Sequence, residues 1–287
     1  MVFILNVINL LFQKFRLILY TLWTLFKHEI PKNELCLRID VVILVIEKDL
    51  EILPLCIEGI KINVIHNIEN IYIVAPEIES IKQFCRSNNL VYVCENEVLG
   101  YSPDKINYFV HNNFNRSGWI FQQLVKLSGK VGTARYYLVI DSDHILLSPH
   151  SFITDDNLMI FYQSSEFHFQ YYKMNRQLIG SYRNSLFSFV SHKMLFDKEE
   201  IHRLHSEIEK NHRNIFQWDE IIISNLDKKE MSCFSEFELY GNYISRKQKI
   251  SFPWRQKSLR KDKFMAYNDL KKRYAKYWSV TFPSYLN

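Results

Sequence analysis

The sequence predicts an α/β fold in which helices cover both faces of a mostly parallel central sheet. Short apolar runs of strand length alternate with helical patterns, which is typical of parallel strands joined by crossover helices. A large packed core is also required, because 47% of the 287 residues are hydrophobic while only 7 are Gly and 7 are Pro. This composition excludes disordered, collagenous and low-complexity proteins. Five cysteines without a CxxC pair argue against a disulfide framework and a zinc ribbon, and they favour a reducing compartment.

Residues 1–30 are predicted to form an amphipathic helix that associates with a membrane. The segment is almost wholly apolar, but Gln13, Lys14 and Arg16 interrupt it, so no charge-free run reaches the roughly 18 to 20 residues that a spanning helix needs. At helical spacing, six polar residues fall on one narrow stripe: Asn6, Asn9, Gln13, Arg16, Thr24 and Lys27. A broad apolar face beside such a stripe suits the plane of a bilayer interface, where Lys and Arg reach the headgroups. The alternative is a helix packed in a dimer or under a domain.

After Pro31 the chain alternates between strands and helices. Apolar runs predict strands over 35–46, 71–75 and 90–94, and helical spacing predicts helices over 50–62 and 77–85. Strands joined in this way form a parallel sheet, and ligands of such sheets bind beyond the carboxyl ends of the strands. Asp49 lies at that position, in the polar loop that ends the first strand.

The most informative strand follows a helix predicted over 118–127. This strand, over 136–140, is fully apolar and runs directly into Asp141 and Asp143. Two carboxylates at the end of a buried strand suit a hard divalent cation that bridges substrate phosphates. The alternative is a pair of aspartates that cap or turn the chain.

The positive charge is concentrated near the carboxyl end of the chain. Residues 246–276 contain twelve Lys or Arg against Asp262 and Asp269, a net charge of +10, which leaves −5 for the rest of a chain whose total is +5. Aromatic residues are interleaved with these charges. The stretch forms either a solvated helical face or a surface for anionic lipid headgroups or phosphorylated ligands. No motif supports a nucleic-acid partner.

Three segments carry a resemblance to a known family. They are Gly-Trp-x-x-Gln-Gln-x-x-Lys-Leu at 118–127, Asp-x-Asp at 141–143 and Ser-Glu-aromatic-Glu-x-Tyr-Gly at 235–241. Together they resemble the GT-A glycosyltransferases, and especially a little-characterised bacterial branch of them. The resemblance runs from about Asp40 to Trp254. It implies a Rossmann-like GT-A catalytic domain over 35–254. The resemblance does not cover the amphipathic helix before this domain or the basic, aromatic extension over 255–287.

The resemblance implies a nucleotide-sugar donor and a divalent cation, Mn²⁺ or Mg²⁺. Asp143 is expected to hold the cation, and Asp141 to assist directly or through water. In an inverting transferase a carboxylate must deprotonate the acceptor hydroxyl, and Glu236 and Glu238 are the candidates. Glu236 is favoured, because Ser235 and Glu238 have the spacing of a capping box, which gives Glu238 a structural role. In a retaining transferase neither glutamate needs to act as a base.

Four further polar residues are weaker candidates for the same site. His192 is placed in the metal shell, against the donor, or at a purely structural position. Gln122 and Lys126 share a face of the predicted helix, where they either contact phosphate or sugar or are solvated. Asp49 lies where a GT-A fold receives the nucleotide base.

The function expected from the sequence is transfer of a sugar to a cell-surface glycan or lipid-linked acceptor, as in bacterial polysaccharide or lipopolysaccharide biosynthesis. The enzyme is expected to lie on the cytoplasmic face of the cell membrane as a peripheral protein. The alternative is a membrane-docked binding or scaffold protein with the same fold and no catalysis. A haloacid-dehalogenase phosphatase is disfavoured because its Asp-x-Asp strand opens the chain. A Rossmann dehydrogenase is disfavoured because no Gly-x-Gly-x-x-Gly follows a predicted strand.

Overall fold

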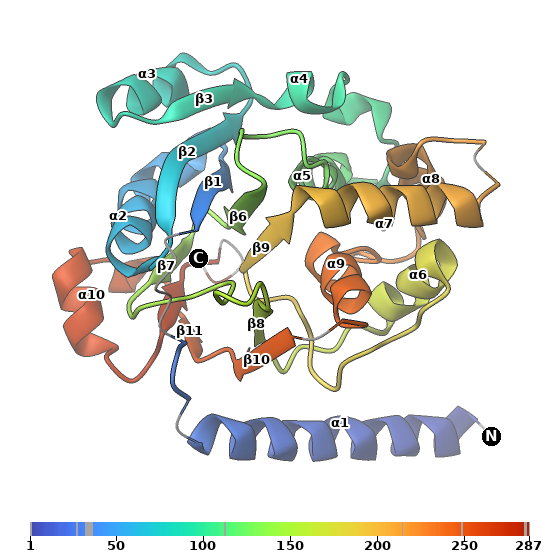
Figure 1. Ribbon diagram of the computed structural model, residues 1–287. Helices are drawn as coiled ribbons and strands as arrows, with labels where there is room; N and C mark the ends of the chain where they lie inside the picture. The colour runs from blue at the N-terminus through green and yellow to red at the C-terminus, as the bar shows by residue number, and fades with distance from the viewer. Residues whose placement is uncertain are drawn as a thin grey trace.

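The computed structural model describes residues 2–26, 28–31, 37–111, 113–213, 215–247, 249–283 and 286, with side chains from residue 11 onward. Parts of the predictions lie outside these residues: the first two residues of the strand over 35–46, Lys27, and the side chains of Asn6 and Asn9. Figure 1 shows a body built around a central sheet, with the long helix α1 (Val2–Leu25) along its lower edge.

A five-stranded sheet forms the centre of the body (Figure 1). Its strands are β1 (Arg38–Leu44), β2 (Asn67–Ala75), β3 (Val91–Cys94), β6 (Tyr136–Ile140) and β9 (Lys193–Asp197), in the spatial order β3-β2-β1-β6-β9. The first four run parallel, whereas β9 runs antiparallel to β6. The predicted α/β fold with a mostly parallel central sheet is therefore confirmed. The order of the four parallel strands is that of a Rossmann-like sheet.

Helices connect the parallel strands and cover both faces of the sheet. α2 (Leu53–Asn63) joins β1 to β2, and α3 (Glu79–Ser87) joins β2 to β3. The chain then steps back across the sheet through α5 (Ser117–Leu127) before it enters β6. Because such crossovers are right-handed, this step back places α5 on the face opposite α2 and α3. A short 3₁₀ helix, η1 (Glu47–Glu51), precedes α2, so the α-helix starts later than the sequence predicts.

An acidic residue inside β1 fixes the entry to β6. Asp40 is fully buried, and its Oδ2 atom accepts hydrogen bonds from the amides of Thr133 (2.7 Å) and Ala134 (2.8 Å). Gly132 precedes them with φ +80°, and an added Cβ would lie 2.4 Å from the same oxygen. Only glycine fits this left-handed, crowded position, and the turn it makes delivers the chain into the strand that ends at the acidic pair.

Smaller sheets lie beside the central one. β8 (Met159–Gln163) pairs in parallel with β10 (Lys249–Pro253), and β7 (His144–Leu146), β11 (Gln256–Ser258) and β12 (Ser279–Thr281) form a three-stranded sheet. The basic stretch over 246–276 thus supplies strands to both, as well as α10 (Tyr267–Arg273), whose Leu270 is fully buried. The remaining elements are α4 (Glu95–Leu99), α6 (Phe169–Ile179), α7 (Lys198–Asn211), α8 (Trp218–Ser224), α9 (Glu236–Ile244), η2 (Pro103–Lys105), η3 (Lys261–Lys263), β4 (Phe109–Val110) and β5 (Phe114–Asn115).

The inner face of α1 carries polar side chains that bind the body. Arg16 is only 2% exposed, and its guanidinium donates to the carbonyl oxygens of Ser165 (2.5 Å), Glu166 (2.8 Å) and Leu186 (3.2 Å). Arg16 therefore points into the protein. The expectation from the sequence that Arg16 reaches toward lipid headgroups is wrong. The physical reason is that the carbonyl groups of these irregular segments need donors, and the guanidinium supplies several at once.

The outer face of α1 and the residue that follows it are apolar and exposed. Their side chains, with exposed fractions of 49–75%, are Leu11, Phe15, Leu17, Ile18, Leu22, Leu25 and Phe26. The helix thus exposes large apolar side chains to solvent, whereas a helix of a soluble domain buries such side chains. Among the helices of the described residues, none is long and apolar enough to cross a membrane.

Candidate functional site

The acidic pair lies where β6 leaves the central sheet. Asp141 follows the last buried residue of β6, and its amide donates to the carbonyl oxygen of His192 at 2.9 Å. The amide of His144 donates to the carbonyl oxygen of Asp141 at 3.0 Å and closes the turn. His192 lies at this edge because β9 pairs antiparallel with β6, with Lys193 opposite Ile140.

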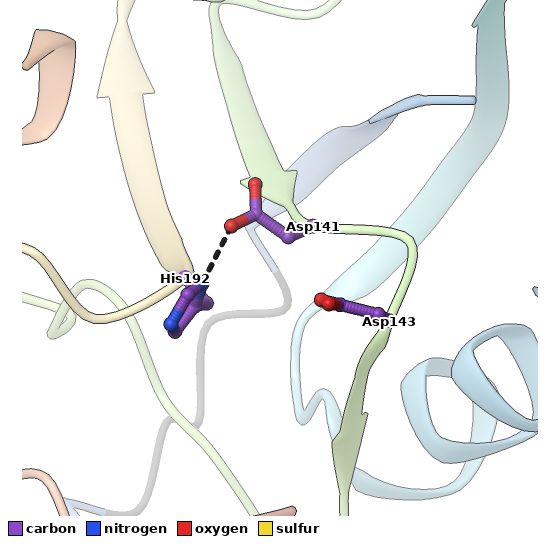
Figure 2. Close-up of side chains that lie close together, drawn as sticks. All are labelled: Asp141, Asp143 and His192. Atoms are coloured by element: carbon purple, nitrogen blue, oxygen red, sulfur yellow. Dashed lines mark hydrogen bonds and ion pairs between the residues drawn. The ribbon is translucent and has the colours of Figure 1, made fainter. Parts of the chain in front are cut away.

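Asp141, Asp143 and His192 form a group that can hold a metal ion. Each offers one ligand atom, and these atoms all lie within 4.8 Å of one another. The Nδ1 atom of His192 lies 2.7 Å from Oδ2 of Asp141, and Figure 2 shows the Asp143 carboxylate pointing toward this pair. Oxygen and imidazole ligands at this spacing fit a divalent cation. In the described part of the chain, no second cluster of three such ligand residues occurs.

The backbone of His192 adopts a costly conformation. Its φ angle is +57°, in the left-handed region that residues other than glycine rarely occupy. This conformation allows the carbonyl group of His192 to accept from the Asp141 amide while its ring meets the Asp141 carboxylate. Strain of this kind persists only where the surroundings enforce it, and it concentrates at functional sites.

The charges of the three residues act on one another. Burial and the charge of Asp141 raise the pKa of Asp143. Burial would lower the pKa of His192, but the hydrogen bond and charge of Asp141 and the charge of Asp143 raise it. Crowded carboxylates of this kind are stabilised by a cation, because its charge relieves their repulsion.

Lys126 connects the acidic pair to the segment at 235–241. Its Nζ atom lies 2.6 Å from Oδ1 of Asp141 and 3.1 Å from Oε1 of Glu236. Burial would lower the pKa of Lys126, but these two carboxylates raise it, so the side chain is an ammonium. The same contact and that of His192 outweigh burial and hold the pKa of Asp141 below its usual range. The structure therefore brings together Lys126, Asp141 and Glu236, all of which are sequence-predicted candidates.

Glu236 is held from two sides by α5. The carboxyl is 3% exposed, and burial raises its pKa while Lys126 opposes that shift. With the amide of Gln123 oriented to donate, its nitrogen lies 2.8 Å from Oε2 of Glu236 and 2.9 Å from the carbonyl oxygen of Phe234. Gln123 is a site residue that the sequence analysis missed, although it stands in the same motif. Among the described residues, no hydrogen bond joins its neighbour Gln122 to this group.

Glu238 is a structural residue of the same helix. Its Oε2 atom accepts from the hydroxyl of Ser188 (2.6 Å) and the amide of Phe189 (3.0 Å), and its Oε1 atom accepts from Nδ2 of Asn242 (2.8 Å). The hydroxyl of Ser235 caps α9 by accepting from the Glu238 amide at 3.4 Å. The reciprocal half of the predicted capping box does not form, because the Glu238 carboxylate binds the 188–189 loop instead of the serine amide.

Asp49 lies beside the acidic pair, at the start of a pocket. Its Oδ2 atom accepts from the hydroxyl of Ser142 (3.0 Å) and the amide of Ile46 (3.1 Å), so it ties the end of β1 to the turn after β6. The pocket next to it is lined by Lys48, Asp49, Glu51, Ile52, Asp143, Lys261, Phe264 and Phe282. Part of the lining thus comes from η1, and another part comes from the carboxyl-terminal segment.

The carboxyl-terminal segment also touches the acidic pair directly. The hydroxyl of Thr281 donates to Oδ1 of Asp143 at 3.2 Å, and the amide of Phe282 donates to the Asp143 carbonyl oxygen at 3.1 Å. These contacts follow from the antiparallel pairing of β12 with β7, the strand that begins directly after the acidic pair. The sequence did not predict Thr281 and Phe282 as site residues, because no local pattern predicts the pairing of β12 with β7, which are more than 130 residues apart.

Two solved structures match this chain over most of its length at low sequence identity. Mouse xyloside xylosyltransferase 1 in its apo form has 8% identity and a TM-score of 0.46, with 88% of this chain and 99% of that chain covered. The galactosyltransferase LgtC with donor and acceptor sugar analogues has 12% identity and a TM-score of 0.42, with 85% and 87% covered. No curated protein matches the sequence. A family model matches residues 52–276, and the chain therefore belongs to DUF6492, a family of unknown function.

Proposed function

We propose that this protein is a metal-dependent GT-A-type glycosyltransferase that moves a sugar from a nucleotide-sugar donor to an acceptor hydroxyl. The observation that carries the proposal is the grouping of Asp141, Asp143 and His192 at the carboxyl edge of a Rossmann-like sheet, beside a pocket. Ligands of such sheets bind at this edge. The segments that resemble GT-A glycosyltransferases supply Lys126, Asp141 and Glu236 to the same place.

The metal group is proposed to hold Mn²⁺ or Mg²⁺. Two carboxylates favour these hard cations, and the imidazole of His192 favours Mn²⁺ between them. When bound, such a cation neutralises the charge of a departing diphosphate. Asp143 would be the principal ligand, because Asp141 already shares its carboxylate between Lys126 and His192.

The pocket beside Asp143 is proposed to take the nucleoside diphosphate of the donor. Lys48 and Lys261 supply positive charge for phosphates, with Lys261 exchanging its ion pair to Glu51 (3.0 Å) for the ligand, and the exposed ring of Phe264 supplies an apolar surface for a base. Asp49 lies in the same wall, which agrees with its expected place near the nucleotide.

Lys126 and Glu236 are proposed to act on the reacting groups. The Lys126 ammonium lies beside the metal group and is placed to stabilise negative charge on the leaving diphosphate. In an inverting reaction Glu236 accepts the proton of the acceptor hydroxyl. In a retaining reaction Glu236 instead orients Lys126 through their ion pair.

The outer face of α1 is proposed to rest on the cytoplasmic face of a membrane, where a surface glycan or lipid-linked acceptor is found. Its exposed Leu, Phe and Ile side chains support this proposal, because a lipid interface is the surface that would cover them. Ile18→Asp places a charge on this face and is expected to weaken binding to anionic lipid vesicles about tenfold. Ser87→Asp, an exposed position on α3 at the opposite end of Figure 1, is the charge-matched control. Equal sedimentation of both variants with vesicles would contradict the docking.

The experiment that tests the enzymatic proposal is thermal unfolding with UDP, GDP, ADP and CDP, with and without Mn²⁺. A ligand of the folded state raises the free energy of unfolding by about 2.7 kcal/mol at 100 times its Kd. One nucleotide is expected to stabilise the parent chain only with Mn²⁺, to stabilise the exposed control Asp156→Ala equally, and to leave Asp143→Ala unchanged. A folded parent that no nucleotide stabilises would favour the non-catalytic scaffold.

A further inference from the structure

We infer that α1 supports the metal site as well as facing outward, and that Tyr20 and Trp254 are the positioning residues that transmit this support to His192. The inference rests on the proposed metal group. It concerns what holds His192 in place, whereas the proposed function concerns what His192 and the two aspartates bind.

Tyr20 fastens α1 to the end of the β8–β10 pair. Its hydroxyl lies 3.0 Å from the carbonyl oxygen of Gln163 and 2.9 Å from that of Trp254. The amide of Trp254 donates to the same Gln163 carbonyl at 2.7 Å. The hydroxyl thus closes a junction between the helix, the last residue of β8 and the residue that follows β10.

Arg255 makes a second link between this junction and α1. Its guanidinium donates to the carbonyl oxygen of Phe26 at 2.6 Å and to that of Thr24 at the carboxyl end of the helix. A cation at this end of a helix meets unpaired carbonyl groups and the negative end of the helix dipole. The neighbouring residues Trp254 and Arg255 are therefore both held by α1.

Trp254 in turn packs against the histidine of the metal group. The centroids of the Trp254 and His192 rings lie 5.2 Å apart, and the His144 ring stacks on His192 at 5.7 Å. His192 keeps its left-handed backbone only while its surroundings enforce it. Of the two neighbouring rings, that of Trp254 belongs to the residue whose carbonyl group Tyr20 binds. A chain of contacts therefore runs from α1 through Tyr20 and Trp254 to a proposed metal ligand.

The experiment measures the affinity of the whole chain for Mn²⁺ by electron paramagnetic resonance. The samples contain no nucleotide and no lipid. Tyr20→Phe removes the hydroxyl but keeps the ring that packs on Trp23 and Phe187. Residues that orient a metal ligand typically change metal affinity about 10- to 100-fold when altered. We expect Trp254→Ala to weaken Mn²⁺ binding about tenfold or more and Tyr20→Phe to weaken it several-fold. Trp254→Phe, which retains an aromatic wall, is expected to restore most of the affinity.

The matched control is Thr21→Val, which deletes a hydroxyl that donates to Leu17 within the same helix. It is expected to bind Mn²⁺ as the parent does, and circular dichroism checks that each variant is folded. The resonance spectrum at saturating Mn²⁺ depends on the ligands of the ion, so it reports whether His192 is still one of them. A general loss of stability would leave this spectrum unchanged. If Trp254→Ala does not fold, Tyr20→Phe decides the question, because it removes only the hydroxyl that binds the carbonyl groups of Gln163 and Trp254.

The outcomes separate this inference from the metal site itself. If the parent binds Mn²⁺, Asp143→Ala does not, and Tyr20→Phe and Trp254→Ala bind as the parent does, the metal site stands and the support by α1 is overturned. If Thr21→Val weakens binding as much as Tyr20→Phe, the effect is not specific to the junction and the inference is likewise overturned. A folded parent that binds no Mn²⁺ overturns the metal site and the inference together.

Discussion

Glu236 and Glu238 stand two residues apart in the first turn of α9, and both are buried, yet they belong to two different environments. Glu236 faces a charged partner, the Lys126 ammonium, which it shares with Asp141. Glu238 accepts hydrogen bonds from three neutral donors, which fix a loop and the helix itself, and the guanidinium groups of Arg16 and Arg183 act on it through their charge without a hydrogen bond. Burial alone therefore does not mark a functional carboxylate. The kind of partner does, since an ion pair can be rearranged by an incoming charge, whereas a set of neutral donors holds a fold.

The largest effect is expected when the charge of Glu236 is removed. Glu236→Gln keeps the size of the side chain, but it accepts through one oxygen instead of two and cannot take up a proton, so sugar transfer should fall by about 10²- to 10⁴-fold if the reaction inverts. Transfer rates with the donor found by the stabilisation screen measure this. Glu238→Gln is the matched control, with a much smaller loss of rate. Parent-like transfer by Glu236→Gln would remove Glu236 as the base.

The next largest effect is a loss of folding stability when the Glu238 carboxylate is removed. Glu238→Ala leaves the buried Ser188 hydroxyl and Phe189 amide without their acceptor, and Nδ2 of Asn242 keeps only the backbone carbonyl oxygen of residue 238, so the free energy of unfolding should fall by about 3 kcal/mol. Urea denaturation measures the loss. Glu58→Ala, at an exposed position of α2, should change stability by no more than about 0.5 kcal/mol. If both variants unfold alike, Glu238 does not hold the loop.

A smaller effect sharpens the account of Glu238. Ser188→Ala removes one of its three donors, so the free energy of unfolding should fall by about 1.5 kcal/mol, less than for Glu238→Ala. The two losses should not add in the double variant, because Ser188 and Glu238 share one interaction. Additive losses in urea denaturation would show that the serine acts independently of the carboxylate.

The features that were predicted correctly are those that depend on local sequence patterns. The alternation of strands and helices and the position of Asp141 and Asp143 after a buried strand follow from periodicity within short windows, and the structure has both. His192 was a weaker candidate because its place depends on the antiparallel pairing of β9 with β6, more than fifty residues apart at that point. The spacing of Ser235 and Glu238 likewise predicted a capping box, but Ser188 and Phe189 offered the carboxylate better donors from elsewhere in the chain.

The side of α1 that contacts the body could not be predicted from the sequence, for a similar reason. Helical spacing defines a polar stripe but not what the stripe meets, and Arg16 meets the carbonyl groups of residues more than 140 positions away. Thr281 and Phe282 reach Asp143 by an equally distant pairing. In each case a tertiary contact decided the outcome, and no local propensity encodes it.

The proposed transferase activity is tested by incubating the protein with a panel of nucleotide-sugars and Mn²⁺ and measuring the release of nucleoside diphosphate. We predict that one donor is consumed, slowly without acceptor and faster with one. We also predict that EDTA stops the reaction and added Mn²⁺ restores it, while Asp143→Ala stays inactive and the exposed control Asp156→Ala behaves as the parent. A folded protein that consumes no donor, and whose nucleotide binding does not depend on Mn²⁺ or Asp143, would contradict the account.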